Sequence, residues 1–337
     1  MSEAKPCTVD VNEGRMKLKS RAGMTLFAAL RTNGVLLPTG CGARGECGQC
    51  KVTLLSGRAG LMTDNEVKLI PEDERAAGKR LGCQLRLEDD IAVRVPEYVF
   101  DAKERNATLT EVIPLTHDIK RFSFSLEDGD TVPHRAGQFM TLIAKVPDHP
   151  GQVMRCFSFA TSSRVVDRVD IIVRRTPKGV MTPFLFEQAK PGDRFRMIAP
   201  YGDFYLREGG APCIWIGGGS GLSPFMGMLQ DLMDREERRP VHLFFGAVYP
   251  KDLYYVDLLN DIAKHNDWFT FTPALSGDER CDFCHDYGLI TEVVDRHVAD
   301  ARNAEGYLCG GPGMIGACIK LLTEKGMPRD KIFYDRF

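Results

Sequence analysis

Four cysteines have the type and spacing of a site that holds two iron ions. Cys41, Cys47 and Cys50 lie in one short loop in the order C-x5-C-x2-C, and Cys83 follows in the segment Leu-Gly-Cys-Gln-Leu. A [2Fe–2S] cluster needs four thiolates that converge on two irons, and one loop can supply three of them. Zinc would prefer two C-x2-C pairs in tetrahedral geometry, and this region has one such pair. The cluster is therefore favoured over zinc and over incidental buried thiols.

Three glycines, Gly42, Gly45 and Gly48, accompany the loop cysteines. Glycine adopts a positive φ at little steric cost, so the loop can curl tightly and expose its backbone N–H groups. Such N–H groups would stabilise charged sulfurs and tune a reduction potential. The loop therefore predicts a site for electron transfer.

A second group of residues is suited to phosphate binding. The apolar run Cys213–Ile216 leads directly into the segment 217–224, Gly-Gly-Gly-Ser-Gly-Leu-Ser-Pro. A strand, a glycine turn and a helix N-terminus present backbone N–H groups to a diphosphate. Ser223 is expected as the helix N-cap and Pro224 in the first turn. Because position 222 is Leu, the spacing is not G-x-G-x-x-G, and a tight turn without a ligand remains the alternative.

The segment 307–314, Tyr-Leu-Cys-Gly-Gly-Pro-Gly-Met, again joins a short strand to a helix through glycines. The carboxyl ends of parallel strands meet at one edge of a sheet, so Cys309 is expected to face the same crevice as the first glycine loop. The alternative is a small buried side chain that ends a strand.

Arg155, Phe157 and Ser158, in the stretch Arg-Cys-Phe-Ser, combine a guanidinium suited to phosphate with an aromatic ring and a hydroxyl. Alone, this stretch would usually be an ordinary strand. It gains interest from the segment 179–182, Gly-Val-Met-Thr, where a glycine turn opens a helix and offers a second diphosphate cradle.

The segment 281–285, Cys-Asp-Phe-Cys-His, matches the C-x-x-C-H motif for attachment of c-type haem. Such attachment is expected outside the cytoplasm, and the sequence shows no export signal. The favoured interpretation is a solvent-facing loop with incidental thiols, and an adventitious zinc site or a redox pair is the alternative.

The elements that position these residues form three predicted modules, at 1–100, 104–207 and 208–337. The first is a small α+β unit, with a strand at 15–20, a helix at 25–31 that Asn33-Gly34 ends, and a short helix that the capping box at 63–66 opens. The cysteine loop lies between these two helices. The second module has short β-rich runs separated by Gly, Pro and Asp, and one helix at 182–189, which predicts a small antiparallel barrel.

Beyond residue 208, strands and helices alternate, which predicts a parallel sheet covered on both faces. The expected strands and helices lie at 213–216, 225–233, 241–247, 253–263 and 332–334. The fold class is therefore multidomain, α+β followed by α/β.

Composition limits the classes of function. The 337 residues are 43% hydrophobic, enough for sizeable cores, and the net charge of −2 offers no basic field for nucleic acid. No apolar run reaches the length of a membrane-spanning helix, and residues 1–6 lack the apolar stretch of a signal peptide. Eleven cysteines, an odd number, favour thiols and metal ligands over a disulfide framework. We expect a cytoplasmic protein.

Four motifs together closely resemble the ferredoxin–NADP reductase superfamily of flavoproteins, with a ferredoxin module fused at the N-terminus. In chain order they are the cysteine motif, the Arg-Cys-Phe-Ser stretch with the turn at 179–182, the glycine loop at 217–224 and the segment 307–314. The resemblance implies a β-grasp ferredoxin domain, an antiparallel barrel that binds FAD and a parallel-sheet domain that binds NAD(P). Arg155 would contact the flavin diphosphate, Phe157 would pack along the flavin and Ser158 would lie near its N5 atom. The backbone donors to the diphosphate would come from Gly179, Val180, Met181 and Thr182.

The same resemblance assigns residues to the pyridine nucleotide. Cys309 would lie close to the nicotinamide, and Phe337, an aromatic at the C-terminus, would cover the flavin ring until the nicotinamide displaces it. The remaining residues expected at this ligand are Gly218, Gly219, Ser220, Gly221, Leu222 and Gly310.

Among subfamilies, the ferredoxin half is most similar to the NADH-oxidising component of the sodium-translocating NADH:quinone reductase. The shared features are the x5 spacing, the Cys-Gly-Gln-Cys loop and the Pro-Glu-x-x-Phe stretch at 96–100. Two departures are the missing N-terminal membrane helix and the shorter flavin domain. We therefore expect a reductase for a protein acceptor, such as an oxygenase or a corrinoid protein, and keep the peripheral subunit of a quinone reductase as the alternative.

The hypothesis is that NADH passes a hydride to FAD, and that the cluster then delivers single electrons to the acceptor. Ser158 and Cys309 would align the reacting rings, with Phe337 as the shield. NADH is favoured over NADPH because the segment 246–255 contains one cation, Lys251, and no Arg for a 2′-phosphate. A non-catalytic iron–sulfur carrier with degenerate nucleotide domains is the alternative from another class.

Overall fold

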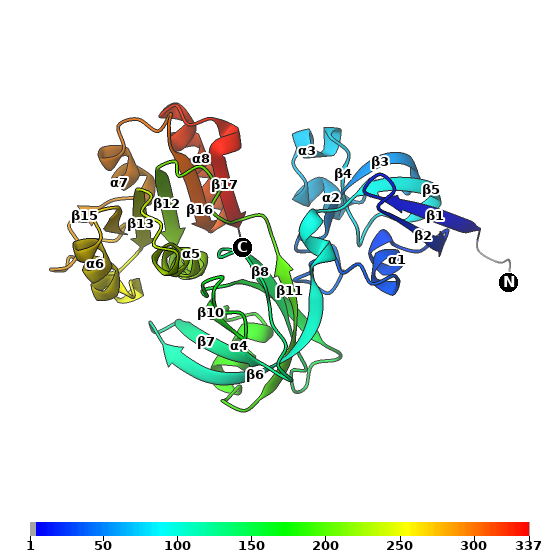
Figure 1. Cartoon of the computed structure of the whole chain (residues 1–337), viewed down its shortest axis with the longest axis horizontal. Helices are drawn as coiled ribbons and strands as arrows, with labels where there is room; N and C mark the ends of the chain where they lie inside the picture. Colours follow the sequence, from blue (N-terminus) through cyan, green and yellow to red (C-terminus); the bar gives the residue numbers. More distant parts are fainter. Residues whose placement is uncertain (1–4, 337) are drawn as a thin grey trace. The chain divides into compact units, whose positions relative to one another are not determined.

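In the computed structural model, residues 5–336 are described. The N-terminal module is a five-stranded mixed sheet of order β2-β1-β5-β3-β4, in which β1 runs parallel to β5 and antiparallel to β2 (Figure 1). Its side chains alternate, so that Val9, Val11, Ile91 and Val93 point into the core. The strands are β1 Pro6–Val11, β2 Met16–Arg21, β3 Lys51–Ala59, β4 Lys79–Leu81 and β5 Leu87–Arg94.

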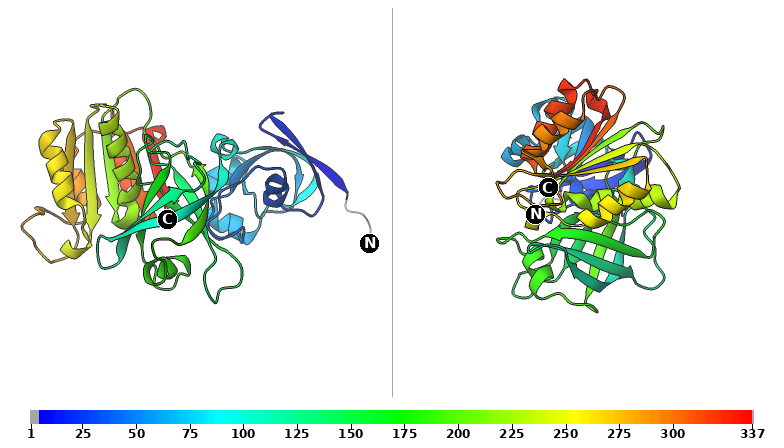
Figure 2. Two further views of the ribbon diagram at one scale, coloured as in Figure 1. Left: turned by 60° about the horizontal axis from the view of Figure 1, so that its bottom comes forward. Right: turned by 90° about the vertical axis from the view of Figure 1, so that its left-hand side faces the viewer.

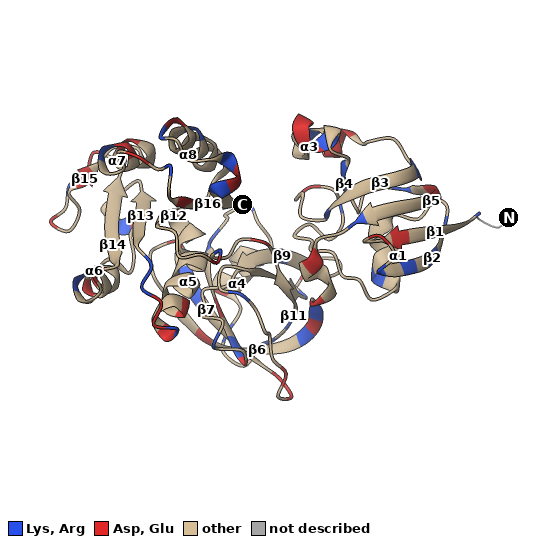
Figure 3. Cartoon of the chain, turned by 45° about the horizontal axis from the view of Figure 1, so that its top comes forward, with Lys and Arg blue, Asp and Glu red and all other residues tan. Residues whose placement is uncertain are grey.

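Both predicted helices of this module are present, and the first is shifted by one residue from the predicted 25–31. Thr25 caps α1 (Leu26–Thr32) by accepting the N–H of Ala28, and the backbone leaves the helix through Asn33. Thr63 and Glu66 form the expected capping box of α2 (Asp64–Leu69). A further short helix, α3 (Glu72–Ala76), carries acidic residues in its first turn, where they complement the helix dipole (Figure 3).

The middle of the chain forms a six-stranded antiparallel sheet of order β10-β7-β6-β11-β8-β9. The short β-rich runs predicted for this module are its strands, and the helix predicted at 182–189 is present as α4, at Met181–Glu187. The elements are β6 Lys103–Pro114, β7 Ile119–Leu126, β8 Phe139–Ala144, β9 Val153–Ser158, β10 Arg168–Arg174, α4 Met181–Glu187 and β11 Arg194–Tyr201, with a 3-10 turn, η1 Glu97–Phe100, before them.

The C-terminal part is a parallel sheet of order β15-β14-β13-β12-β16-β17. Its strands are β12 Cys213–Gly218, β13 Val241–Ala247, β14 Phe269–Leu275, β15 Asp286–Tyr287, β16 Glu305–Gly310 and β17 Ile332–Arg336. Its helices are α5 Leu222–Asp234, α6 Val256–His265, α7 Ile290–His297 and α8 Pro312–Glu324, with the 3-10 turns η2 Gly219–Gly221, η3 Pro250–Asp252 and η4 Arg329–Lys331.

Helices cover both faces of this sheet, as predicted. Trp215 of β12 packs into a core shared with α5 and α6, whereas its neighbours Ile214 and Ile216 pack into a second core with α7 and α8. Because successive side chains of a strand point to opposite faces, one apolar strand supplies both cores. Figure 2 shows α6, in yellow, alongside the parallel strands.

By their internal contacts the residues form two compact units. The first takes the described residues up to Ala107 with Phe139–Phe157 and Phe195–Gly202, and the second takes Thr108–Gln138, Ser158–Arg194 and Asp203 onward. Within residues 5–336, no helix is both long enough and apolar enough to cross a membrane.

Candidate functional site

The cysteine loop has the conformation that its glycines predicted. Gly42, Gly45 and Gly48 all adopt positive φ, of 68°, 78° and 72°. Side chains other than glycine are strained in this region of φ and ψ, so the glycines let the loop curl. A larger residue at position 45 would also crowd the Gln84 side chain, because a Cβ there would lie 2.6 Å from Nε2 of Gln84.

The four predicted ligands meet as two pairs. The thiols of Cys41 and Cys47 are hydrogen-bonded to each other, and so are those of Cys50 and Cys83. The bond from Cys47, together with backbone N–H groups of Arg44, Glu46 and Cys47, lowers the pKa of Cys41 to about 4, although burial opposes the shift. Inward backbone donors thus stabilise a thiolate here, as the glycine pattern predicted.

In the second pair, the bond from Cys50 is the largest cause that lowers the pKa of Cys83 to about 7, with further donors from Gln84 and the backbone of Gly45. The pKa of Cys50 is raised. The largest cause is its hydrogen bond to Cys83, in which Cys50 keeps the proton, and the second cause is burial. The two pairs also interact electrostatically, since the charge of Cys41 acts to raise the pKa of Cys83.

This arrangement fits a two-iron cluster better than zinc. A structural zinc site needs four ligands around one point, whereas the two irons of a [2Fe–2S] cluster can each take one pair of thiolates. The donor set is all sulfur, as that cluster prefers.

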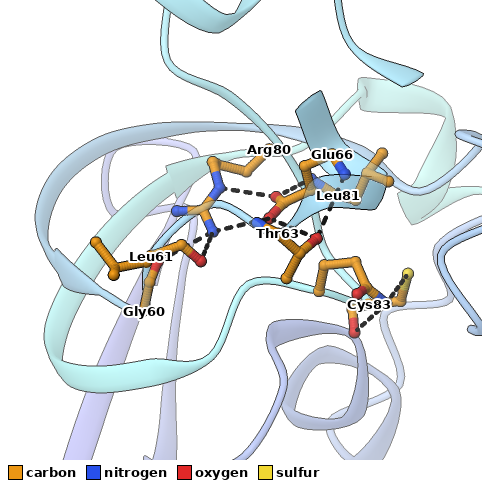
Figure 4. Close-up of polar contacts among 8 residues, drawn as sticks. Gly60, Leu61, Thr63, Glu66, Arg80, Leu81 and Cys83 are labelled. Atoms are coloured by element: carbon orange, nitrogen blue, oxygen red, sulfur yellow. Dashed lines mark hydrogen bonds and ion pairs between the residues drawn. The ribbon is translucent and has the colours of Figure 1, made fainter. Parts of the chain in front are cut away.

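A buried ion pair that the sequence analysis missed anchors the cluster module (Figure 4). The Glu66 carboxylate accepts from Nε of Arg80 at 2.7 Å and from the backbone N–H groups of Leu81 and Thr63 at 3.0 and 2.9 Å. The Leu81 carbonyl in turn accepts the N–H of Gln84, so the turn that carries Cys83 starts from this pair. The capping box identified Glu66, but nothing local identified Arg80 as its partner.

Both side chains of this pair are almost fully buried, with 0% of Glu66 and 9% of Arg80 exposed. Burial alone would raise the pKa of Glu66, yet the donors from Arg80, Thr63 and Leu81 together hold that pKa below its usual value. The carboxylate is therefore charged, and it neutralises the guanidinium beside the cluster ligands.

We expect Glu66→Gln to destabilise this module by about 3 kcal/mol, because it leaves the buried Arg80 charge without its counter-charge. Urea unfolding of the holoprotein, followed by the visible absorption of the cluster, measures the effect. Glu74→Gln is the matched control: Glu74 pairs with Lys51 at 2.6 Å, but both side chains are more than a quarter exposed, and the cost should stay below about 1 kcal/mol. Equal losses in both variants would contradict the anchoring role of Glu66.

The predicted flavin residues Arg155, Phe157 and Ser158 lie on β9, and their side chains are only partly buried. In the first unit, Nη1 of Arg155 donates to the carbonyl of Gly40 at 2.9 Å and to that of Met154 at 2.6 Å. Arg155 is thus bonded to the backbone just before the cysteine loop, which the sequence did not predict. Both bonds use Nη1, so the Nη2 side of the guanidinium suits a phosphate.

The segment Gly179–Thr182 opens α4 as predicted, although the helix begins at Met181. The Thr182 hydroxyl accepts the N–H of Thr176 at 2.8 Å, which closes the turn on itself. A Cβ at Gly179 would lie 3.1 Å from the Thr176 carbonyl oxygen, so a larger residue would crowd this turn. A glycine followed by the start of a helix fits a backbone cradle for a diphosphate.

The glycine loop after β12 differs from the prediction in one respect. Gly219–Gly221 form a 3-10 turn, and α5 starts at Leu222, so Ser223 lies inside the helix and is not its N-cap. The Ser223 hydroxyl donates instead to the Ser158 carbonyl at 2.8 Å and accepts the N–H of Ile172 at 3.2 Å. Ser223 therefore ties Ser158 and β10 to the start of α5 within the second unit.

At two positions of the loop, close neighbours leave no room for a side chain larger than that of glycine. A Cβ at Gly221 would lie 2.2 Å from the Cys309 carbonyl oxygen, and a Cβ at Gly218 would lie 2.9 Å from the sulfur of Met314. Met314 also fills the space over Gly310. The two glycine segments that the sequence analysis singled out therefore pack directly on each other, at the carboxyl ends of β12 and β16.

The loop also has two neighbours that the sequence analysis missed. The buried Tyr254 hydroxyl donates to the Gly219 carbonyl at 2.9 Å. The Arg174 guanidinium lies against Gly219, where a Cβ would approach Nη1 to 2.8 Å, and its Nε donates to Asp118 at 2.9 Å. A guanidinium beside a glycine-rich turn suits an anionic ligand.

Cys309 and Ser158 are brought together by a third residue, Asp335. Asp335 faces Cys309 in the register of β16 and β17, and its carboxylate accepts the Ser158 hydroxyl at 3.1 Å. Cys309 itself is fully buried, and burial, followed by the charge of Asp335, raises the pKa of its thiol. The thiol is therefore neutral, and the alternative of a small buried side chain fits its burial equally well.

Asp335 is a candidate functional residue that no sequence pattern around it identified, apart from its place near the C-terminus. Burial raises its pKa to about 6, against the bonds from Ser158 and the Arg336 backbone. A carboxyl that changes charge near pH 6, bonded to the predicted flavin residue Ser158, has the pKa expected of a functional site. Phe337, the predicted shield, lies outside the described residues.

Because Asp335 has a raised pKa when folded, it favours the native state below its unfolded pKa, and this contribution is lost as the pH rises through about 6. We expect wild type to lose about 1 kcal/mol more than Asp335→Asn between pH 5 and 7. Urea unfolding at a series of pH values measures the difference. Parallel pH profiles for the two proteins would show that the carboxyl is not perturbed.

Three family models match the chain, in the order of the three predicted modules. The 2Fe-2S iron-sulfur cluster binding domain matches residues 9–88, the oxidoreductase FAD-binding domain 106–205, and the oxidoreductase NAD-binding domain 215–320.

Similar proteins cover nearly the whole chain. The reductase subunit of aromatic O-demethylase from Amycolatopsis is 32% identical over 98% of each chain, and the reductase component of propane 2-monooxygenase from Rhodococcus jostii is 31% identical over 93% of this chain and 86% of its own. A subunit of the Na(+)-translocating NADH-quinone reductase of Idiomarina loihiensis is 29% identical over 95% of this chain and 88% of its own. The crystal structure of an Amycolatopsis cytochrome P450 reductase superposes with a TM-score of 0.80 at 31% identity, over 98% of each chain.

The chain belongs to the ferredoxin–NADP reductase family of flavoproteins that carry an N-terminal [2Fe–2S] ferredoxin domain. It is an oxidoreductase in which electrons pass from NAD(P)H through FAD to a [2Fe–2S] cluster. These comparisons confirm the predicted resemblance, the fold class and the two resident cofactors.

Proposed function

We propose that the protein oxidises NADH, in preference to NADPH, and delivers single electrons from its cluster to a separate redox protein. The observation that carries the electron-delivery step is the pairing of four cysteine thiols inside one folded module, with Cys41 bonded to Cys47 and Cys50 bonded to Cys83. FAD, when bound, supplies the hydride chemistry, and the cluster supplies one-electron transfer.

The preference for NADH rests on the segment that follows β13. Lys251 is its one cation, and its ammonium group lies over the Tyr249 ring, 5.3 Å from the ring centre. The same segment places a carboxylate, Asp252, whose oxygen accepts the Tyr249 N–H at 3.1 Å. A 2′-phosphate dianion prefers an Arg at this position and is repelled by a carboxylate.

The protein's own residues would position the reactants. Arg155 and the Gly179–Thr182 turn would hold the flavin diphosphate, while Gly219–Leu222 and Arg174 would hold that of the nucleotide. Ser158 would orient the reacting edge of the flavin through its bond to Asp335, at 3.1 Å. Cys309, next to Asp335 in the sheet, would lie under the nicotinamide as a neutral thiol.

Among acceptors, an oxygenase or a comparable redox protein such as a corrinoid protein is our first candidate. Two relatives that match almost the whole chain are named as reductase parts of an O-demethylase and of a monooxygenase. The second candidate is a quinone reductase with this chain as its NADH-oxidising subunit, which the likeness to the Na(+)-translocating enzymes favours. We propose a cytoplasmic location, because eleven cysteines, an odd number, favour thiols and metal ligands over a disulfide framework.

The test compares kcat/KM for NADH and NADPH in the holoprotein, with ferricyanide as acceptor. We expect a preference for NADH of at least about tenfold, and a preference for NADPH would overturn the nucleotide proposal. Reduction of cytochrome c, compared with that of a soluble quinone, then separates the two acceptor classes. Faster turnover with the quinone than with any protein acceptor would favour the second candidate.

A further inference from the structure

The function just proposed does not use the C-x-x-C segment of the NAD-binding module. Cys281 and Cys284 are partners in an isolated antiparallel bridge, and Asp282 and Phe283 form the turn between them. Directly opposite residues in such a bridge have Cα atoms about 4.5–5.5 Å apart. A disulfide needs a Cα separation of about 4.4–6.8 Å, so the backbone already has the spacing for one.

The two thiols differ in access to solvent. Cys281 is partly buried, whereas Cys284 is 0% exposed and belongs to the core of the module. The Cys284 thiol donates to the carbonyls of Pro273 and Asp286, at 3.3 and 3.4 Å. An accessible thiol beside a buried one is the arrangement in which the first attacks a disulfide and the second resolves the product.

The turn is held in shape by one aromatic residue. The Tyr287 hydroxyl donates to the Cys284 carbonyl at 2.6 Å and accepts the Cys281 N–H at 3.3 Å. The Arg280 guanidinium stacks on the Tyr287 ring, 3.9 Å from its centre. Both cysteines are thus fixed to the same hydroxyl, which limits the loss of chain entropy on closing a bond between them.

The same geometry disfavours the other uses of this motif. Attachment of haem through a C-x-x-C-H motif requires both sulfurs to be accessible, and Cys284 is buried. In the described part of the chain, no three potential ligands are placed to hold a metal ion, which leaves the exposed His285 outside any such group. The favoured expectation of a solvent-facing loop is wrong for Cys284, which is buried, and of the alternatives to incidental thiols the redox pair fits this geometry best.

The turn is connected to the segment that follows β13, where nucleotide choice is expected. The N–H groups of Ser276 and Gly277 donate to the carbonyls of Ala247 and Val248, at 3.0 and 2.8 Å. A Cβ at Gly277 would lie 3.0 Å from the Tyr249 ring. The stretch that leads into the Cys281–Cys284 loop is therefore hydrogen-bonded to the nucleotide-choice segment.

We propose that Cys281 and Cys284 form a thiol–disulfide exchange site that takes a small disulfide such as oxidised glutathione as its oxidant, and that its state alters NADH affinity. In the first step the Cys281 thiolate attacks one sulfur of the oxidant, and one glutathione thiol leaves. In the second, the Cys284 thiolate displaces the other glutathione thiol and closes the Cys281–Cys284 bond. The two cysteines lose two protons and two electrons, and the oxidant gains them as two thiols.

The coupling to NADH, which rests on the proposed function, follows from the hydrogen bonds of Cys284. A disulfide has no S–H, so the hydrogen bond that the Cys284 thiol shares between the carbonyls of Pro273 on β14 and Asp286 on β15 is lost. Both residues are partly buried, and loss of a hydrogen bond at this position would loosen the edge of the sheet. Because the adjoining loop is bonded to residues 247–248, we expect a several-fold change in KM for NADH with little change in kcat.

The first test treats the intact holoprotein with oxidised glutathione or with dithiothreitol, checks that the cluster absorption is retained, and alkylates the thiols under denaturing conditions. Trypsin then releases residues 281–296 as one peptide with two cysteines. We expect this peptide, after oxidation, to lack two hydrogens and carry no alkyl group. A doubly alkylated peptide would overturn the site, whichever nucleotide the enzyme uses.

Two variants test the order of the steps. In Cys284→Ser, Cys281 should keep glutathione as a mixed disulfide; in Cys281→Ser, the buried Cys284 should remain a free thiol. Cys318, buried alone in α8, is the internal control and should be alkylated under both treatments. Glutathione retained on Cys284 in the Cys281→Ser variant would overturn the assignment of Cys281 as the attacking group.

The second test measures KM and kcat for NADH in the oxidised and reduced wild type and in Cys281→Ser. A several-fold change in KM in the wild type only would support the coupling. An unchanged KM in a protein whose peptide carries the disulfide would overturn the coupling.

Discussion

Replacing Cys47 with serine is expected to abolish electron delivery to cytochrome c, by at least about 100-fold, while NADH-dependent reduction of ferricyanide stays within about twofold of wild type. Cys47 is one member of the first thiol pair, and its sulfur also accepts the Gly40 N–H at 3.4 Å. Loss of one thiolate leaves one iron with an incomplete ligand set. Ferricyanide can take electrons before the cluster, so only the last step of the sequence should fail.

Cys7→Ser is the matched control for this experiment. Cys7 is a buried cysteine of β1 in the same module, and its thiol donates to the Lys5 carbonyl rather than facing the cysteine loop. It should retain both activities and the visible absorption of the cluster. Equal loss of both activities in Cys47→Ser, with normal Cys7→Ser, would contradict the order flavin before cluster.

Features that depend on neighbouring residues could be predicted from the sequence. The left-handed glycines of the cysteine loop, the Thr25 cap and the Thr63–Glu66 capping box all follow from short-range chemistry. The alternation of strands and helices beyond residue 208 was also visible, because apolar strands in a parallel sheet are buried on both faces.

Features that depend on residues distant in the sequence could not be predicted in this way. The sequence identifies Glu66 as a cap, but its charge is balanced by Arg80. Ser158 is a predicted flavin residue, but its hydroxyl donates to Asp335, which no local pattern identified. The Ser223 cap was wrong because Gly219–Gly221 wind into a 3-10 turn, so the helix starts earlier and the hydroxyl faces β9 instead. In each case the decisive partner comes from another element, and the sequence contains no measure of the distance to it.

These long-range partners concentrate where the modules carry out their chemistry. Glu66 and Arg80 fix the turn that carries Cys83, and Asp335 joins Ser158 to the strand beside Cys309. A reactive group must be held within a fraction of an ångström, and residues from several elements hold it better than one loop. Short-range motifs therefore locate the sites, whereas the long-range contacts determine their geometry.

Gly221→Ala is expected to remove NADH-dependent activity by at least about 100-fold, because the added Cβ would lie 2.2 Å from the Cys309 carbonyl oxygen and 2.7 Å from its carbon. Both atoms belong to the backbone of β16, so the clash cannot be relieved by rotating a side chain. The glycine loop and the end of β16 would have to separate, and overpacking of this kind typically costs about 1–3 kcal/mol or more. The φ of Gly221, −63°, is ordinary, so the effect is steric and not conformational.

Gly313→Ala separates this effect from a general intolerance of alanine near the nucleotide loops. Gly313 lies in the first turn of α8, where an added Cβ meets no atom within 4 Å, and alanine is the better helix former. This variant should keep wild-type activity and gain stability slightly. Stopped-flow measurement of flavin bleaching by NADH, together with thermal unfolding, distinguishes lost binding from lost folding in Gly221→Ala. Normal bleaching in that variant would show that the β12 and β16 loops tolerate separation, and that their close packing is not what builds the nucleotide site.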